Sequence, residues 1–221
     1  MWLRSLVMTM WPVLASLPAA ERDQLLRAGR RRSFAKGEVI FHHGDPADSL
    51  HLLDSGRVSV RVLTPRGEQA ILNVLGPGKV FGELALIDQH AHRTATITAM
   101  EPCETIVLRR AQFEKLRELH PQVDAILLAS LAAQVNRLSE HLLEVLFSPA
   151  PRRVYRRLLV LDREFEGEPI GITQEDLALM AGATRSTVNE ILRELERQGT
   201  VRIGRGRIEV VDRPALARRV R

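Results

Sequence analysis

The chain has 221 residues, 45% of them hydrophobic, and carries a net charge of +5 at pH 7 with an isoelectric point near 10.2. This length suffices for two ordinary domains, and no stretch approaches the roughly eighteen apolar residues that span a bilayer, so no membrane association is expected. The single cysteine, Cys103, excludes an internal disulfide and a cluster held by four cysteines of one chain, and it favours a cytoplasmic protein.

The first half of the chain predicts a short helix followed by many strands. Residues 12 to 30 form the helix, which begins near Pro18, and the opening MWLRSLVMTMWPVL lacks the features of a signal peptide. From Ser33 to Arg109, short apolar or alternating runs predict six to eight strands. The runs are EVIF, SLHLLD, RVSVRVL, AILNVL, TATITAM and ETIVLR, separated by the turn signals GDP, DSG, TPRG, GPG and MEP. This regular spacing predicts an antiparallel roll or barrel.

A helical block follows the strands. Residues 111 to 119 predict one helix, and Pro121 starts a longer one, because proline fits the first turn of a helix. Apolar residues on the longer helix alternate steps of three and four, a heptad seam typical of a helix that pairs with its own copy in a homodimer. The seam consists of Leu128, Leu131, Val135, Leu138, Leu142 and Val145. The alternative is a helix packed on its own roll, and both can hold on different flanks. The SPAP segment at 148–151 ends this helix.

Residues 173 to 198, TQEDLALMAGATRSTVNEILRELERQ, predict a helix-turn-helix. Gly182 breaks the first helix, because glycine alone takes a left-handed turn without a steric penalty, and Thr184 can cap the second helix. The second helix would enter a DNA major groove. Its predicted DNA-binding residues are Thr184, Arg185, Ser186, Asn189, Glu190 and Arg193. The alternative, an ordinary helical hairpin, fits this combination of small, turn and inward residues less well.

A helix from Arg152 to Phe165 precedes this motif, and a ribbon with the tip GRGR follows it. Arg205 and Arg207 in the tip are predicted to reach phosphates or a minor groove, as in a wing, unless the tip is only a solvated turn. Residues 148 to 221 hold 15 arginines against 11 acidic residues, a net charge of +4, while the remaining 147 residues carry +1. The basic excess therefore accompanies the helix-turn-helix, as phosphate neutralisation requires.

A roll, a dimer helix and a winged helix-turn-helix, in this order, resemble the cyclic-AMP receptor protein (CRP/FNR) family of bacterial regulators. The most specific part is FGELALIDQHAHRTAT at 81–96, which resembles the phosphate-binding cassette of that family. The resemblance implies an α+β fold in three parts: an N-terminal effector-binding β-roll of the cyclic-nucleotide-binding type (1–120), a long dimerisation helix (121–147) and a C-terminal winged helix-turn-helix domain (148–221).

The chemistry of the cassette matches a cyclic nucleotide. Gly82 lets the backbone approach a ligand, and Glu83, Leu84 and Ala85 can form a short helix whose N–H groups face a phosphate. Arg93 would neutralise the phosphate and Thr94 would donate a hydroxyl, while Glu83 would accept from a ribose hydroxyl. The effector that the resemblance implies is cyclic AMP or a related cyclic nucleotide such as cyclic GMP, and no cofactor is obligatory.

Two departures from the family pattern affect specificity. In cyclic-AMP-responsive members, adjacent Thr and Ser on the dimer helix contact the adenine, one from each subunit; here Leu138 and Ser139 occupy those places, and leucine cannot form a hydrogen bond. This leaves open a different pose, another anion, or a degenerate cavity with constitutive DNA binding. On the recognition helix, Arg185, Ser186 and Glu190 replace the family's Arg, Glu and Arg. We therefore expect a palindromic operator that differs from the common half-site.

The remaining histidines and the cysteine predict no metal site and no reactive site. His90 and His92 with Asp88, and His42 with His43, lie in segments typical of solvated loops and lack a tetrahedral ligand spacing, so no metal site is expected. Cys103 is interpreted as a small buried side chain. The motifs of phosphate-loop, serine-hydrolase and zinc-protease enzymes are missing from the sequence, so we expect no enzyme.

The sequence thus predicts a homodimeric, allosteric transcription regulator that binds DNA in the cytoplasm and also contacts RNA polymerase. The first alternative is a DNA-binding regulator that needs no effector or uses a different one. The second is a cyclic-nucleotide-binding module that acts on a protein partner, and an enzyme comes third.

Overall fold

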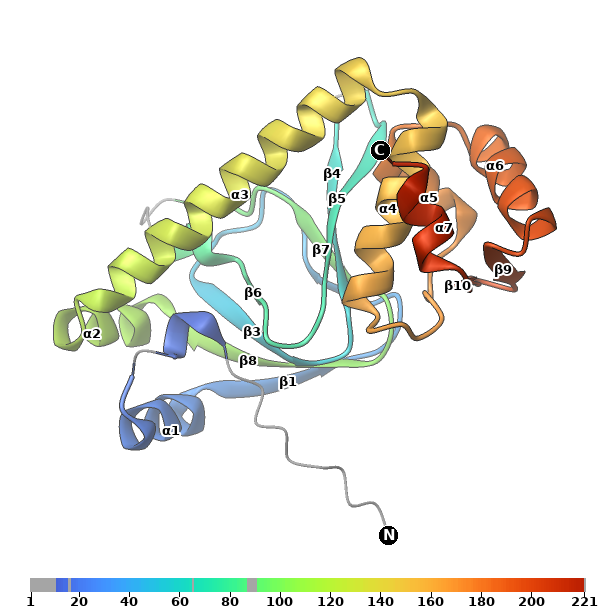
Figure 1. Cartoon of the computed structure of the whole chain (residues 1–221). Helices are drawn as coiled ribbons and strands as arrows, with labels where there is room; N and C mark the ends of the chain where they lie inside the picture. Colours follow the sequence, from blue (N-terminus) through green and yellow to red (C-terminus); the bar gives the residue numbers. More distant parts are fainter. Residues whose placement is uncertain (1–10, 16, 65, 87–90, 221) are drawn as a thin grey trace, which may run out of the picture.

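The fold is described from a computed structural model, which covers residues 11–15, 17–64, 66–86 and 91–220 (Figure 1). Its N-terminal part is a roll of two four-stranded antiparallel sheets. In spatial order the first sheet contains β1 (Arg30–Phe34), β8 (Cys103–Arg109), β3 (Ser49–Ser55) and β6 (Val80–Phe81), and the second contains β2 (Val39–Phe41), β7 (Thr96–Ala99), β4 (Val58–Leu63) and β5 (Gln69–Leu75). These strands confirm the predicted roll.

Short helices cover the first sheet of the roll. They are η1 (Pro12–Leu14), α1 (Ala19–Ala28) and α2 (Arg110–Leu119). Trp11, Leu14, Phe113 and Leu116 pack from this layer onto the apolar side chains of β3 and β8, and the Trp11 indole donates a hydrogen bond to the Leu53 carbonyl oxygen over 3.1 Å. A separate core lies between the two sheets, where Phe34, Leu53 and Phe81 of the first sheet pack with Val58 and Ile97 of the second.

The long helix α3 (Gln122–Phe147) crosses the roll and ends at a sharp corner, after which α4 (Ala150–Glu164) turns back beside the roll (Figure 1). At about 1.5 Å per residue, its 26 residues span about 39 Å. The corner is formed by Ser148 and Pro149, whose backbones are extended, as the SPAP segment predicted. Helix α4 begins two residues earlier than expected, because Pro151 is accommodated in its first turn.

The C-terminal part contains a helix-turn-helix and a ribbon. Its further elements are α5 (Gln174–Ala181), α6 (Arg185–Arg197), β9 (Val201–Gly204), β10 (Arg207–Val210) and α7 (Arg213–Arg218). Helix α7, which no sequence pattern predicted, is capped by the Asp212 side chain, which accepts a hydrogen bond of 2.8 Å from the Ala215 N–H.

The second sheet and the C-terminal part share one hydrophobic core. The register of β4 with β5 shifts between Val60 and Arg61, leaving Leu72 as an additional residue in β5. Because a bulge of this kind reverses the alternation, Ile71 and Val74 face the same side. Both are 2% exposed and belong to the same apolar cluster as the side chains of α4, α5 and α6. Within the described ranges, no helix combines the length and the apolar character that a membrane span needs.

Candidate effector cavity and DNA-binding surface

The second residue of the cassette, Gly82, has a backbone conformation that any other residue could adopt only with strain. Gly82 follows β6 and has a φ of 80°, and it leads into the short 3-10 helix η2 (Glu83–Leu86). A Cβ atom at Gly82 would lie 2.5 Å from Nη1 of Arg93. The backbone of Gly82 and the Arg93 guanidinium therefore depend on each other for their positions.

Arg93 is a buried cation that forms no ion pair with any carboxylate in the described part of the chain. It is 6% exposed, and its guanidinium donates to Ser49 O (2.7 Å), Ser49 Oγ (3.1 Å) and Gly82 O (3.3 Å) while stacking 4.1 Å above the Phe41 ring centroid. Among the described residues no carboxylate lies within ion-pair distance of it, and its Nε is buried without a hydrogen-bond acceptor. Burial lowers the pKa of Arg93, against the opposing effect of Asp48, Asp45 and Glu83. An anion at this point would compensate both deficits.

Glu83 lies beside this cation and is itself largely removed from water. Burial raises the pKa of its carboxyl above the ordinary value, while its own backbone N–H and the charge of Arg93 act in the opposite direction. A buried carboxyl group needs hydrogen-bond donors, and a ligand hydroxyl is a donor of this kind.

A cavity of about 490 Å³ joins the cassette to the two long helices. The roll lines it with the predicted Gly82, Glu83, Leu84, Arg93 and Thr94, and α3 contributes Leu138. Ser139 is exposed and does not line the cavity of its own protomer, while Ala85 is placed only through the backbone of η2. The volume is in the range of small-molecule sites.

Several cavity residues were missed by sequence reasoning. Helix α3 adds Gln134 and Arg137, which flank the heptad seam and could have been found from their spacing. Helix α4 adds Arg156, Arg157 and Val160. These three carry no local signal, because they reach the cavity only through the corner between the helices.

The predicted seam of α3 is largely free in the single chain. Its members Leu128, Val135, Leu138, Leu142 and Val145 are 41% to 66% exposed, and Leu131 is half-buried. Only Val123 and Glu144 of the whole helix are buried. A row of exposed large apolar side chains at heptad spacing is typical of a helix–helix interface.

The helix-turn-helix has the local geometry that its sequence predicted. The Thr173 side chain accepts from Asp176 N at the start of α5, Gly182 ends α5 with a φ of 58°, and Thr184 accepts from Thr187 N at the start of α6. Ala178 and Val188 lie in the buried core between these helices and α4. Capping at both starts and a left-handed turn between them fix the angle of α6.

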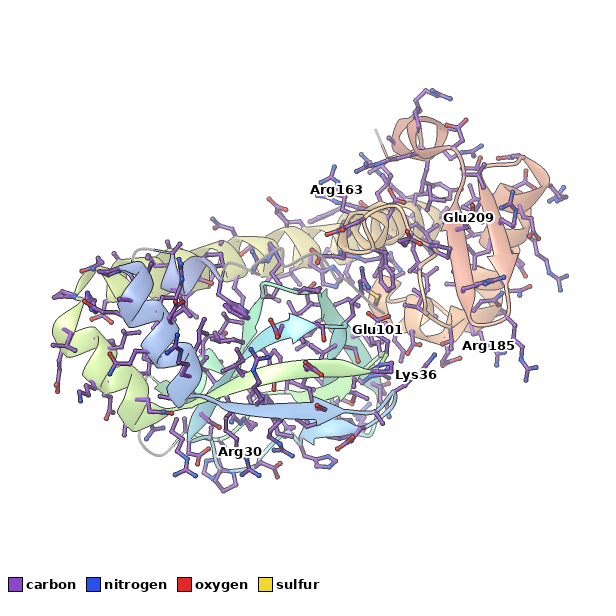
Figure 2. The ribbon with its side chains drawn as sticks, turned by 90° about the horizontal axis from the view of Figure 1, so that it is seen from below. Arg30, Lys36, Glu101, Arg163, Arg185 and Glu209 are labelled. Atoms are coloured by element: carbon purple, nitrogen blue, oxygen red, sulfur yellow. The ribbon has the colours of Figure 1, made fainter. Side chains whose placement is uncertain are left out.

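Most of the predicted DNA-binding side chains are exposed, and one has an internal role. Thr184, Arg185, Ser186, Glu190 and Arg193 are exposed on α6 or its cap, and Figure 2 labels Arg185. The Asn189 amide instead donates to Gln174 Oε1 over 2.7 Å, which ties α6 to α5. In the ribbon, Arg205 and Arg207 are exposed on either side of Gly206, whose φ is 67°.

The remaining reactive residues behave as solvated or structural groups. Cys103 is 1% exposed, and burial raises the pKa of its thiol to about 11, which confirms it as a buried small side chain. His42, His43 and His92 are exposed, whereas Asp88 and His90 lie outside the described residues. In the part of the chain that is described, no three His, Cys, Asp or Glu side chains are grouped to hold a metal.

Known proteins share both halves of this architecture. A family model for a cyclic nucleotide-binding domain matches residues 31–120, and one for a Crp-like helix-turn-helix domain matches residues 152–219. The cyclic AMP receptor protein of Thermus thermophilus is 35% identical over 199 residues, which cover 90% of this chain and 92% of that protein. A CRP-like cAMP-activated global transcriptional regulator of Mycobacterium tuberculosis is 30% identical over 195 residues, covering 85% of this chain and 87% of that protein.

The solved structures agree on the fold. A c-di-GMP-responsive global regulator from Xanthomonas campestris superposes with a TM-score of 0.75 over 87% of this chain and 99% of that one, at 20% identity. The relatives are regulators rather than enzymes. With both domain types matched and a relative of 35% identity over nearly the whole chain, the protein belongs to the CRP/FNR family and is a DNA-binding transcription regulator with a cyclic-nucleotide-binding domain.

Proposed function

We propose that the chain works in the cytoplasm as a homodimer whose roll binds a cyclic nucleotide, cyclic AMP or cyclic GMP, and that binding controls its affinity for a palindromic DNA operator. One observation carries this proposal: Arg93, a buried cation with no carboxylate partner among the described residues, lies in a cavity beside Glu83 and Thr94. Relatives named as cAMP-activated or as a cyclic AMP receptor support the same class of effector.

The cassette would hold the sugar and phosphate of the nucleotide. Arg93 and the Thr94 hydroxyl donate to the cyclic phosphate, and Glu83 accepts from the ribose hydroxyl. The N–H groups of Glu83, Leu84 and Ala85 in η2 face the same anion. The base then extends towards α3, where Leu138 lines the cavity, while the exposed Ser139 points to the contribution of a second subunit.

Pairing of two α3 helices through the exposed seam would form the dimer. A two-fold axis along the seam relates the two α6 helices, which fits successive major grooves about 34 Å apart. Arg185, Ser186, Glu190 and Arg193 would contact base edges, Thr184 and the ribbon residues Arg205 and Arg207 would contact the DNA backbone, and RNA polymerase would be contacted next to the operator. The effector must bind one arrangement of these parts more tightly than another, because otherwise its binding would not change the equilibrium between the arrangements.

Calorimetric titration of the full chain with cyclic AMP and cyclic GMP tests the cavity. We expect Arg93→Ala to abolish binding, whereas Arg66→Ala, which removes an exposed arginine from the β4–β5 hairpin, leaves the affinity unchanged. The melting temperature of each variant checks that it is folded. Equal binding by wild type and Arg93→Ala would contradict the proposed phosphate site.

A DNA-binding assay separates the alternatives. The operator is selected from random duplexes, and its Kd is measured with and without nucleotide at two salt concentrations. No response to either nucleotide together with tight, salt-dependent binding would favour a regulator that needs no cyclic nucleotide. Nucleotide binding without any DNA binding would favour a module that acts on a protein partner.

A further inference from the structure

One wall of the effector cavity comes from the DNA-binding domain. Because the chain turns at Ser148 and Pro149, α4 runs back beside the roll (Figure 1). Arg156, Arg157 and Val160 of α4 therefore line the same cavity as Glu83 and Arg93. Facing them, α3 presents Ser130, Gln134, Leu138, His141 and Glu144 at steps of three and four, which is one side of a helix.

At this wall, two arginines of α4 converge on a buried carboxylate. Glu144 is 6% exposed; its Oε2 accepts a hydrogen bond from Nη2 of Arg157, and its Oε1 lies 3.3 Å from Nε of Arg156. The same Nη2 of Arg157 also contacts Nδ1 of His141. Burial, followed by the charge of Arg157, lowers the pKa of His141, which favours the neutral ring. The cluster thus has an acceptor in Glu144 and a donor in Arg157 next to each other.

Several residues of this cavity have buried polar atoms that form no hydrogen bond with the described residues. Among the described residues, five buried side-chain polar atoms form no hydrogen bond, and three of them belong to cavity residues: Arg93 Nε, Glu144 Oε1 and Arg157 Nε. Buried polar groups in folded proteins are almost always paired. Arg93 Nε is such a donor at the phosphate end. At the opposite wall, where the base would extend, Arg157 Nε is a second donor, and Glu144 Oε1 accepts no hydrogen bond from the described residues, although it lies within ion-pair distance of Arg156.

We propose that Glu144 and Arg157 bind the adenine base of cyclic AMP, so that the DNA-binding domain itself forms part of the effector site. Glu144 Oε1 accepts from the exocyclic amino group, and Arg157 Nε donates to the adjacent ring nitrogen. Adenine offers an amino donor beside a ring-nitrogen acceptor along both of its exposed edges. In DNA, carboxylates accept from the amino group of cytosine and arginine donates to N7 of guanine, so each of the two groups has a suitable partner on adenine. This inference rests on the proposed nucleotide site, and it supplies the polar base contact that Leu138 cannot make.

The proposal links ligand binding to the position of the DNA-binding domain. A nucleotide held by Arg93 at one end and by Arg157 at the other spans the roll and α4, so it binds only when α4 lies against the roll. By thermodynamic reciprocity, DNA must change the affinity for cyclic AMP by the same factor as cyclic AMP changes the affinity for DNA.

The test compares cyclic AMP with cyclic purine riboside monophosphate, which differs only by the missing amino group. The variant is the double replacement Glu144→Leu with Arg157→Leu, because removing both charges together leaves neither one stranded in the interior. Arg163→Leu is the matched control: Arg163 belongs to α4, is exposed, and lies away from the strands of the roll (Figure 2).

We expect wild type and the control to bind cyclic AMP about tenfold more tightly than the analogue, as one hydrogen bond to a charged group would give. The double variant should bind both ligands with the same Kd, and this Kd should be weaker than that of wild type for the analogue, because the Arg157 contact to the ring nitrogen is lost as well. Retained discrimination in the double variant, or unchanged binding of the analogue, would overturn the proposal. Tighter binding of cyclic GMP by wild type would do the same.

The outcomes distinguish this inference from the proposed function. If wild type binds no cyclic nucleotide, the proposed effector site fails and the base contact fails with it. If wild type binds both ligands in a manner that depends on Arg93, but without preference for the amino group, the site stands and only the role of Glu144 and Arg157 is lost.

Discussion

Arg61 of β4 and Asp176 of α5 form an ion pair over 2.8 Å, although 115 positions separate them in the chain. Both side chains are partly buried. A second contact is made just before β4, where Arg57 stacks on Phe165 and donates to the Glu164 carbonyl oxygen over 3.0 Å. The first helix of the DNA-binding motif is therefore held on the roll of its own subunit.

The coupling between Arg61 and Asp176 can be measured with a double-mutant cycle. Asp176 also accepts a hydrogen bond from the Thr173 backbone N–H, so Asp176→Ala should cost more free energy of unfolding than Arg61→Ala. We expect a coupling energy of about 1 kcal/mol from chemical denaturation of the two single variants and the double variant. Additive losses would mean that the ion pair contributes nothing to docking. Arg66→Ala on the same hairpin serves as the neutral control.

The seam of α3 predicts a dimer that a single charge can break. Leu142→Glu places a carboxylate within the predicted seam, and we expect the dimer Kd to rise by about 100-fold or more, because unpaired charges are costly to bury. Ala133→Glu places the same charge on an exposed position away from the seam and should leave the dimer intact. Analytical ultracentrifugation distinguishes the two. A dimer that tolerates Leu142→Glu would point to a different interface.

Two arginines should contribute differently to DNA binding. Arg185→Ala is expected to cost about 1–3 kcal/mol on the selected operator and to relax the preference at one base pair, as expected for loss of a base contact. Arg205→Ala should weaken binding equally on all sequences and reduce the salt slope by about 1, as expected for loss of a phosphate contact. Titrations against the operator and single-base variants at several salt concentrations measure both effects. A uniform loss for Arg185→Ala would assign it to phosphate instead.

His51 makes the stability of the roll depend on pH. Burial first, and then the charges of Arg93 and Arg32, lower the pKa of His51 to about 3, while its ring stacks on Phe81 with centroids 5.0 Å apart. The unfolded chain takes up this proton near pH 6.5, so unfolding is favoured as the pH falls from about 6.5 towards 3. When the pH falls from 7 to 5, His51 should lower the free energy of unfolding by about 2 kcal/mol.

The variant His51→Gln removes this titration while keeping a polar partner for the Thr105 hydroxyl, which lies 3.2 Å from Nδ1 of the histidine. Urea denaturation at both pH values should show a smaller pH-dependent loss in the variant than in wild type. The variant His42→Gln replaces a histidine at an exposed position in the same way and should match wild type. Identical losses in all three proteins would exclude His51 as the cause.

Features that depend on neighbours in the chain could be predicted from the sequence. Thr173, Gly182 and Thr184 specify two capped helices and the turn between them through contacts within a few residues, and the structure has all three in these roles. Strands with an alternating or apolar pattern were found as well. Strands β1 and β6 were not: four of the five residues of β1 are exposed and it pairs only with β8, and β6 has only two residues.

Features that depend on contacts across the chain could not be predicted. The bulge in β5 turns Ile71 towards a domain that begins nearly eighty positions later, and Arg157 reaches the cavity only because α4 folds back at the corner. Asn189 has the spacing of a DNA-contacting residue, yet its amide is bonded to Gln174 in the neighbouring helix. The roles of the cavity and surface residues in binding remain predictions.

The core that Ile71 and Val74 share with the DNA-binding domain limits how this molecule can change shape. Separating α5 from β5 would return these two side chains to water at a cost of about 3–6 kcal/mol. Rotation of the DNA-binding domain about Ser148 and Pro149 is therefore opposed by the exposure of these two side chains. Each stable arrangement of the domain has to shield these side chains from water, so a change of arrangement would replace one apolar packing contact with another.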